Sequence, residues 1–263
     1  MSSTTARGTR PHVPGLGAFV AIAMAAGTAL APQSAIALTS YEATVICPID
    51  GQAFVTTMTG STFQSGMRLD FKPIGALIAP YPYPVCPGNG FVVYRNDFSN
   101  SELHAIRTIV LGDEYRRLRS ENTDYFMVAY VKQRLGADDY DLGSTYLRAS
   151  WEAERNAPHL TGRYQELALE KFGAFTQGKR THTEEWWTAS VLAAELDRLL
   201  GRFDAVERRF NALPLAELNA SHPALRNVLD QIRMLALRHN SEPEEMDSRG
   251  FVDGTVGLKD ARM

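Results

Sequence analysis

A helical hairpin is easiest to recognise at residues 194–210, which read AELDRLLGRFDAVERRF. Apolar residues recur at helical spacing on both sides of Gly201, and a glycine just after the last periodic residue is a typical helix end. Leu200 therefore closes one helix, and Phe203 and Phe210 face back onto it from the next. The stretch predicts two antiparallel helices that are joined at Gly201.

Helical signals continue through the whole of residues 99–239. Ser99 followed by Glu102 is a capping-box pattern that begins a helix. Cap residues, glycines and prolines mark further helices at 124–135, 145–156, 162–176, 183–200, 202–212 and 223–238. The hairpin at Gly201 fits a tetratricopeptide unit in part, although no copy recurs at a period of about 34 residues. We expect an antiparallel helical-hairpin, tetratricopeptide-like domain.

The longest of these predicted helices, 183–200, carries an apolar stripe. Three leucines share the stripe: Leu192, Leu196 and Leu199. Glu195 and Arg198 lie off it, so the helix is predicted to bury one side and to expose these two charges. Trp186 and Trp187 point about 100° apart on a helix, so both need not be buried. We expect one of the two rings at an interface with a partner.

Residues 38–98 have a different character, because β-branched and aromatic residues stand between prolines and glycines, as in short strands and turns. The two cysteines of the chain lie here in two copies of one frame: Cys47 begins CPIDG and Cys86 begins CPGNG. Each frame is half of a zinc knuckle, with Asp50 and Asn89 where a second cysteine would stand. The predicted fold class is α+β, mostly α, with this small strand and turn module followed by the helical hairpins.

These stretches together resemble an uncharacterised bacterial family called domain of unknown function 2225. The resemblance rests on CPIDGQAF, on YPYPVCPGNGFVVYRNDFS and on the helical stretch quoted above, and it covers roughly residues 41–210. Members with intact frames look like zinc ribbons joined to tetratricopeptide-like helices, and the family has no assigned activity. The resemblance therefore implies an architecture more than a function, and Asp50 and Asn89 depart from its zinc-binding pattern.

Three states of the two cysteines are open. In the first, Cys47 and Cys86 form a disulfide, because paired half-knuckles without a metal bring the sulfurs within reach of a bond. Such a bond persists in an oxidising compartment. In the second, both cysteines are thiols, and in the third Cys47, Asp50 and Cys86 hold zinc with one further ligand. We expect the disulfide and no resident cofactor.

Residues 1–37 have the parts of a secretory signal peptide. Arg7 and Arg10 precede an apolar run, and small residues precede two cleavage sites, one after Ala31 and one after Ala37. We expect cleavage after Ala37, and the alternatives are an uncleaved membrane anchor and an organellar transit peptide. No later segment is apolar enough to cross a bilayer. The protein is therefore expected to be exported, to the periplasm or the outside of a bacterial cell.

The composition limits the classes of function. A net charge of -3 and a pI of about 6.1 leave no basic excess for binding phosphates, so we expect no nucleic-acid partner. Residues 240–263 are polar and predict a disordered tail. No run of residues forms a catalytic signature, so we expect a non-enzymatic scaffold that binds a protein or an envelope component. Weak zinc binding or metal sensing is the alternative, and a hydrolase with an inter-domain site is a third hypothesis.

Overall fold

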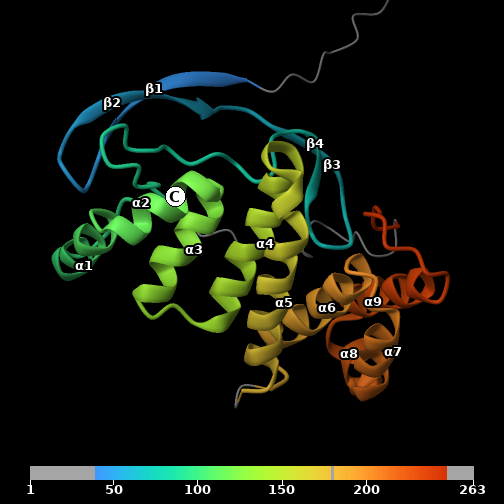
Figure 1. Ribbon diagram of the computed structural model, residues 1–263. Helices are drawn as coiled ribbons and strands as arrows, with labels where there is room; N and C mark the ends of the chain where they lie inside the picture. Colours follow the sequence, from blue (N-terminus) through green and yellow to red (C-terminus); the bar gives the residue numbers. More distant parts are fainter. Residues whose placement is uncertain (1–38, 179–180, 248–263) are drawn as a thin grey trace, which may run out of the picture. The chain divides into compact units, whose positions relative to one another are not determined.

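The computed structural model describes residues 39–178 and 181–247 (Figure 1). The predicted signal peptide, residues 1–37, lies outside this part of the chain. The described residues are mostly helical, and a small module of antiparallel strands precedes the helices. At this level the predicted fold class is confirmed. No helix within the two described ranges is long and apolar enough to span a membrane.

The strand module contains two separate antiparallel pairs. β1 (Ser40–Ile46) pairs with β2 (Ala53–Thr59), and β3 (Phe63–Met67) pairs with β4 (Pro73–Ala76). The register places the end of β1 opposite the start of β2. The first cysteine frame is therefore the connection between these two strands.

Residues 91–99 connect the second cysteine frame to the helical part. Its elements are α1 (Asn100–Val110), α2 (Asp113–Glu121), α3 (Asp124–Arg134), α4 (Asp139–Asn156), a short 3-10 turn (Pro158–Leu160), α5 (Thr161–Thr176), α6 (Glu184–Leu199), α7 (Phe203–Ala212), α8 (Leu215–Ser221) and α9 (Pro223–Ala236). The capping box of Ser99 and Glu102 is present at the start of α1, as predicted.

Two helices, α2 and α8, and the start of α4 are the main differences from the sequence prediction. α2 is missing from the prediction because it is polar and buries only Tyr115, and α8 is too short to show a helical period. α4 begins before the predicted range because Asp138 is its N-cap, and the Asp138 carboxylate accepts from the Asp141 N–H at 2.9 Å. The sequence misses α2 and α8 because their apolar periodicity is weak. It misplaces the start of α4 because several neighbouring residues could cap the helix.

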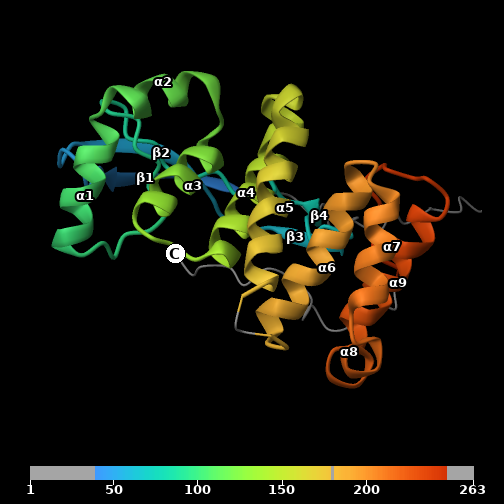
Figure 2. The same cartoon turned by 60° about the horizontal axis from the view of Figure 1, so that its bottom comes forward.

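The helices pack as successive neighbours, with α4 on α5, α5 on α6, and α6 on both α7 and α9 (Figure 2). α6 therefore has other helices on more than one side. Nearly all of its side chains are buried, which is unusual for a helix with one apolar stripe. The helix predicted to have one solvent-facing side is the centre of the helical part.

The turn between α6 and α7 forms where the sequence places it. Gly201 has a φ of 72°, and its N–H donates to the Arg198 carbonyl at 2.9 Å. The N–H of Arg202 donates to the Asp197 carbonyl at 2.7 Å. These two bonds form a Schellman motif, which ends a helix at a glycine in the left-handed region. Phe210 then lies in the core, as predicted.

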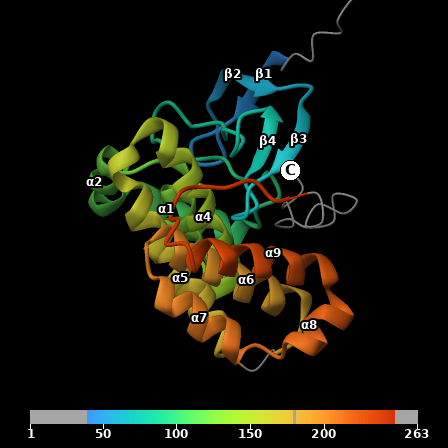
Figure 3. The same ribbon diagram turned by 90° about the vertical axis from the view of Figure 1, so that its right-hand side faces the viewer.

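The segment after α9 crosses from the helices to the strand module (Figure 3). The Leu69 N–H donates to the Glu244 carbonyl at 3.0 Å, and the Met246 N–H donates to the Met67 carbonyl at 2.8 Å. Residues 240–247 are therefore placed beside β3, which contradicts the prediction of disorder for this first part of the tail. Polar side chains do not prevent a segment from being fixed through its backbone.

Candidate functional site

The two cysteine frames fold into the same turn. The Gly51 N–H donates to the Cys47 carbonyl at 2.8 Å, and the Gly90 N–H donates to the Cys86 carbonyl at 2.9 Å. Both glycines have a positive φ, 75° and 73°, which favours a residue without a Cβ. The repeated CPxxG pattern of the sequence is therefore a repeated backbone conformation.

The predicted disulfide between Cys47 and Cys86 is confirmed, with an S–S distance of 2.17 Å and a Cα–Cα distance of 5.5 Å. Both cysteines are fully buried. The residues at the fourth position of the two frames also meet, because the Asn89 side-chain amide donates to the Asp50 carboxylate at 2.9 Å. The same amide lies 3.4 Å from the Cys47 sulfur. The two frames are thus joined by one covalent bond and one polar contact.

The zinc alternative needs free thiolates at Cys47 and Cys86, and in this structure the two sulfurs are bonded to each other. The Asp50 carboxylate accepts from Asn89 and, at 3.0 Å, from the Gln52 N–H. Across residues 39–178 and 181–247, no three His, Cys, Asp or Glu side chains are grouped as metal ligands. Zinc binding by Cys47, Asp50 and Cys86 would therefore first require reduction of the disulfide.

Removing the disulfide should lower the free energy of unfolding. The bond links residues 39 positions apart, and on the chain-entropy model a loop of that length contributes about 3–4 kcal/mol. Urea unfolding of the double variant C47A/C86A should show this loss. Wild-type protein in excess reductant should approach the same midpoint, and an unchanged midpoint in both samples would contradict the expected contribution.

The first two helices hold one frame each. The Arg107 guanidinium of α1 donates to the Ile49 carbonyl at 2.8 Å, inside the first frame. The Tyr115 hydroxyl of α2 donates to the Gly90 carbonyl at 3.0 Å, inside the second frame. The module is therefore attached to the helices through the backbone of its two turns.

Alanine should be tolerated less well at Gly90 than at Gly51. Each position needs a positive φ, which costs an L-residue about 1–2 kcal/mol. An added Cβ meets nothing within 4 Å at Gly51, whereas at Gly90 it would lie 1.7 Å from a nitrogen of the Arg119 guanidinium. We expect a loss of about 1 kcal/mol for Gly51→Ala and about 2–3 kcal/mol for Gly90→Ala in urea unfolding. Equal losses would show that Arg119 moves away at no cost.

The tryptophans named as partner-binding residues, Trp186 and Trp187, are both buried, with 9% and 1% of their surface exposed. The Trp186 indole N–H donates to the Thr176 carbonyl at 2.9 Å, and the two rings meet edge to face with centroids 4.8 Å apart. The prediction that one ring is exposed is therefore wrong. The physical reason is the central place of α6, which buries residues on several sides of the helix.

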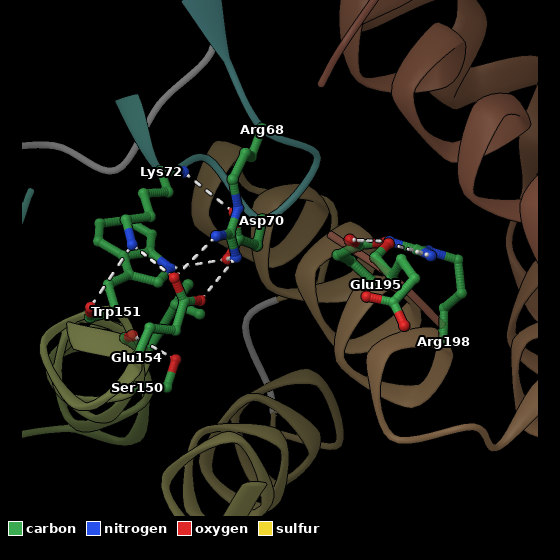
Figure 4. A network of polar contacts seen from close by, with 10 residues as sticks. Arg68, Asp70, Lys72, Ser150, Trp151, Glu154, Glu195 and Arg198 are labelled. Atoms are coloured by element: carbon green, nitrogen blue, oxygen red, sulfur yellow. Dashed lines mark hydrogen bonds and ion pairs between the residues drawn. The ribbon is translucent and has the colours of Figure 1, made fainter. Parts of the chain in front are cut away.

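A partly buried network of charges joins the turn between β3 and β4 to α4 (Figure 4). Arg68 lies 2.6 Å from a carboxylate oxygen of Asp70 and 2.9 Å from Glu154. Lys72 lies 2.6 Å from Glu154, and the Trp151 indole donates to Asp70 at 2.8 Å. Burial alone would raise the pKa of Glu154, but the hydrogen bond and charge of Arg68 outweigh it and lower the pKa. Every charge of this network has a partner, so it braces the fold.

Glu195 and Arg198 form a second buried pair, with two hydrogen bonds of 2.6 and 2.8 Å (Figure 4). Arg198 also donates to the carbonyls of Asn240 and Glu242 at 2.8 and 2.9 Å. Both side chains are at most 1% exposed, so the prediction of solvent-facing charges is wrong. Residues 240–247, which the sequence predicts as disordered, lie over this side of α6. Burial raises the pKa of Glu195 to about 7, against the opposing effect of Arg198.

A cavity of about 410 Å³ lies where residues 83–95 meet α1, α3 and α4. Its lining includes four tyrosines: Tyr83, Tyr94, Tyr125 and Tyr140. It also includes charged side chains from the segment and from all three helices. Burial raises the pKa of Tyr94 to about 12, so this phenol stays neutral. We call this hollow the tyrosine cavity. Sequence reasoning missed it because its lining comes from four separate parts of the chain.

A second hollow, of about 450 Å³, lies between α9 and residues 244–247, and we call it the α9 groove. Its charged lining residues are Asp230, Arg238, Glu244, Glu245 and Asp247. Met234 also lines it and is 49% exposed. The groove exists only because residues 244–247 are fixed beside α9, so a prediction of tail disorder conceals it.

Comparison with known proteins gives no relative. No protein-family model, no curated protein and no solved structure matches this chain. The resemblance to domain of unknown function 2225 therefore stays a prediction. The geometry of the two hollows and of the disulfide module is what bears on function.

Proposed function

We propose that this protein is a non-enzymatic scaffold that binds a protein partner through the α9 groove. The observation that supports the proposal most directly is the combination of acidic walls and an exposed apolar side chain in one groove. Met234 supplies the apolar surface. Peptide-binding grooves commonly pair apolar anchors with complementary charge at the edges.

The wall of the groove is fixed before any partner binds. Arg198 holds the carbonyls of Asn240 and Glu242, and the Asp247 N–H donates to the Gln231 side-chain oxygen at 2.9 Å. The Met246 N–H is bonded to β3. A wall that is already ordered reduces the entropy lost on binding. The α9 groove is therefore suited to a partner that meets it as a preformed surface.

The chemistry of the lining defines the partner. Four carboxylates and one guanidinium give the groove a negative balance, which favours lysine or arginine side chains in the partner. The Gln231 side-chain nitrogen is buried and makes no hydrogen bond among the described residues, so a carbonyl of an entering peptide would complete its hydrogen bonding. The fitting partner is a protein segment with basic and large apolar side chains.

Peptide binding tests this proposal. A fluorescent peptide of alternating lysine and leucine should bind the purified chain, and its affinity should fall as salt rises. A matched peptide of alternating glutamate and leucine should bind much more weakly. Met234→Ser should weaken the lysine peptide about tenfold, the effect of losing one apolar anchor.

The control for that variant is Leu111→Ser. Leu111 is 58% exposed and lies at the end of α1, away from the α9 groove lining. Its replacement should leave peptide affinity unchanged. If both serine variants weaken binding equally, or if the glutamate peptide binds as tightly, the groove is not the binding site that we propose.

Two finer features of the architecture belong to the same proposal. We propose that α6 and α7 are a tetratricopeptide-like hairpin, which the Schellman motif at Gly201 and the buried Phe210 support. We also propose that the two cysteine frames are degenerate zinc knuckles, which the matched turns at Gly51 and Gly90 support. Members of the same family with intact frames would then bind zinc where this chain has its disulfide.

The proposed place of action is outside the cytoplasm, because a disulfide persists in an oxidising compartment. Cleavage after Ala37 would leave Leu38 as the first residue, two positions before the start of β1 at Ser40. The intact mass of the protein recovered from the periplasm or medium should therefore correspond to residues 38–263. A mass that still includes residues 1–31 would show that the segment is retained.

A further inference from the structure

The tyrosine cavity offers a binding site of a different kind from the α9 groove. Its volume of about 410 Å³ falls within the range of about 300–1000 Å³ that is usual for small-molecule sites. Its lining mixes aromatic rings with polar side chains, and its elements are α1, α3, α4 and residues 83–95. The cavity is therefore too small for a folded partner and large enough for a compact organic molecule.

Two of the three cations that line the tyrosine cavity are already paired with carboxylates. Lys132 forms an ion pair of 2.7 Å with Asp141, and Arg95 forms an ion pair with Glu102. Hydrogen bonds from Ser99 and from Arg95 lower the pKa of Glu102 to about 2, so this carboxylate is ionised at neutral pH. The third cation, Arg148, also has an interaction within the chain. An anionic ligand would have to displace carboxylates that are already in place.

Paired charges of this kind suit a ligand rich in hydroxyl groups. Each pair sets hydrogen-bond donors beside acceptors, and a hydroxyl group does both. The Thr145 hydroxyl extends the first pair, because it lies 3.2 Å from the Lys132 ammonium and donates to the Asp141 carbonyl at 2.8 Å. The lining therefore offers both donors and acceptors within a short distance.

Ser144 is an independent observation that points to a ligand. This residue lines the tyrosine cavity and is 5% exposed, and its hydroxyl oxygen is buried with no hydrogen-bond partner among the described residues. An unpaired buried hydroxyl costs free energy that a hydrogen bond would recover. A hydroxyl group of a bound molecule is the simplest partner for it.

The tyrosines supply the apolar part of the site. The rings of Tyr83 and Tyr125 lie 4.9 Å apart, and the Tyr125 hydroxyl is held by the Tyr81 carbonyl at 2.7 Å. The Lys132 ammonium lies 5.7 Å from the centre of the Tyr94 ring. The faces of such rings carry negative charge density, which attracts the weakly positive C–H groups of a sugar ring. The same site thus offers a surface for the C–H face and partners for the hydroxyl groups.

From these contacts we infer that the tyrosine cavity binds a neutral saccharide of one or two rings. This inference is separate from the proposed peptide groove and does not depend on it. The ring would lie against the tyrosines, and its hydroxyl groups would bond to Ser144 and to the Lys132–Asp141 pair. A sugar in the tyrosine cavity would touch residues 83–95 and α4 together.

Binding of glucose, N-acetylglucosamine and their disaccharides to the purified chain tests the inference. Calorimetry and protein-observed NMR with each sugar up to millimolar concentration should show binding of at least one, with shifted amide signals at Ser144 and Thr145. The anionic analogue glucuronate should bind at least tenfold more weakly, because its carboxylate would have to displace Asp141 or Glu102 from the cation that each one pairs with. The variant Ser144→Ala should weaken the neutral sugar about tenfold.

Ser150→Ala is the matched control, because Ser150 is buried on the same helix and bonded to the Leu147 carbonyl, and does not line the tyrosine cavity. It should bind sugar as the wild type does. Three results would overturn the inference: no binding of any neutral sugar, tighter binding of glucuronate, or equal effects of the two serine variants. Each result is read from sugar binding alone, so it leaves the peptide test of the α9 groove unaffected.

Discussion

Replacing Arg198 by methionine should lower the free energy of unfolding by about 3–5 kcal/mol, because it leaves a buried carboxylate without its partner. The Arg198 guanidinium is fully buried and makes two hydrogen bonds to Glu195. It also holds two carbonyls, those of Asn240 and Glu242. Methionine keeps most of the volume of the side chain, so the loss reports the polar contacts. Urea unfolding of the purified variant measures it.

The pH of that measurement matters. Burial raises the pKa of Glu195 from an ordinary 4.5 to about 7. Between these two pH values the folded protein keeps a proton on Glu195 that the unfolded chain releases. The stability that the protonated group contributes is fully present below about 4.5 and is lost as the pH rises through about 7. At about pH 8 the carboxylate is ionised and depends most on Arg198. The effect of Arg198→Met should therefore be larger at that pH than at pH values below about 4.5.

Two further variants decide whether the loss comes from the buried pair. Arg202→Met removes an arginine that is 46% exposed and paired with Glu166, and it should cost less than about 1 kcal/mol. The double variant E195L/R198M removes both charges and should recover much of the stability. If the double variant is as unstable as Arg198→Met alone, the uncompensated charge of Glu195 is not the cause.

Replacing Phe210 by alanine should cost about 3–5 kcal/mol, the usual loss for a buried aromatic ring. Phe210 is 5% exposed. The guanidinium groups of Arg226 and Arg233, both on α9, lie 5.3 and 4.2 Å from the centre of its ring. The ring therefore packs α7 against α9 and also takes part in two cation–π contacts. Thermal or urea unfolding of the variant measures the loss.

The control for Phe210→Ala has to be chosen from the structure. The sequence places Arg209 on the opposite, solvent side of α7, with an expected cost below about 0.5 kcal/mol. In the structure the Arg209 guanidinium lies 2.6 Å from the buried carboxylate of Asp197, so Arg209 does not serve as a neutral control. Arg208 is exposed and is the better control. If Phe210→Ala lowers the free energy of unfolding no more than Arg208→Ala does, the proposed packing of the hairpin is contradicted.

Local signals were enough to predict much of the fold. Three kinds of motif depend only on contacts within a few residues: the capping box at Ser99, the turn at Gly201 and the two CPxxG frames. The local sequence is therefore enough to predict each of them. The disulfide was predictable because the two frames share the pattern CPxxG, and a pair of such half-knuckles is expected to bring the two sulfurs together. In these cases the physical cause of the structure is visible in the order of the residues.

Long-range packing was not predictable in the same way. Glu195 and Arg198 lie off the apolar stripe of α6, yet both are buried, since residues 240–247 return to cover that side. The same return creates the wall of the α9 groove. The tyrosine cavity is lined by residues from four parts of the chain. Composition and residue spacing do not predict that these parts lie together. Both hollows depend on which distant segments lie side by side.

The return of residues 240–247 to β3 also sets an order of events in synthesis. β3 leaves the ribosome long before the Met246 N–H, which donates to its Met67 carbonyl, has been made. Contacts between segments this far apart in sequence slow folding, because a long stretch of chain must be ordered before they form. Until residue 242 has been made, Arg198 lacks a carbonyl that it holds in the finished protein. A nascent chain is therefore expected to remain incompletely folded until residues 240–247 emerge. Until then proteases can cleave it and chaperones can bind it.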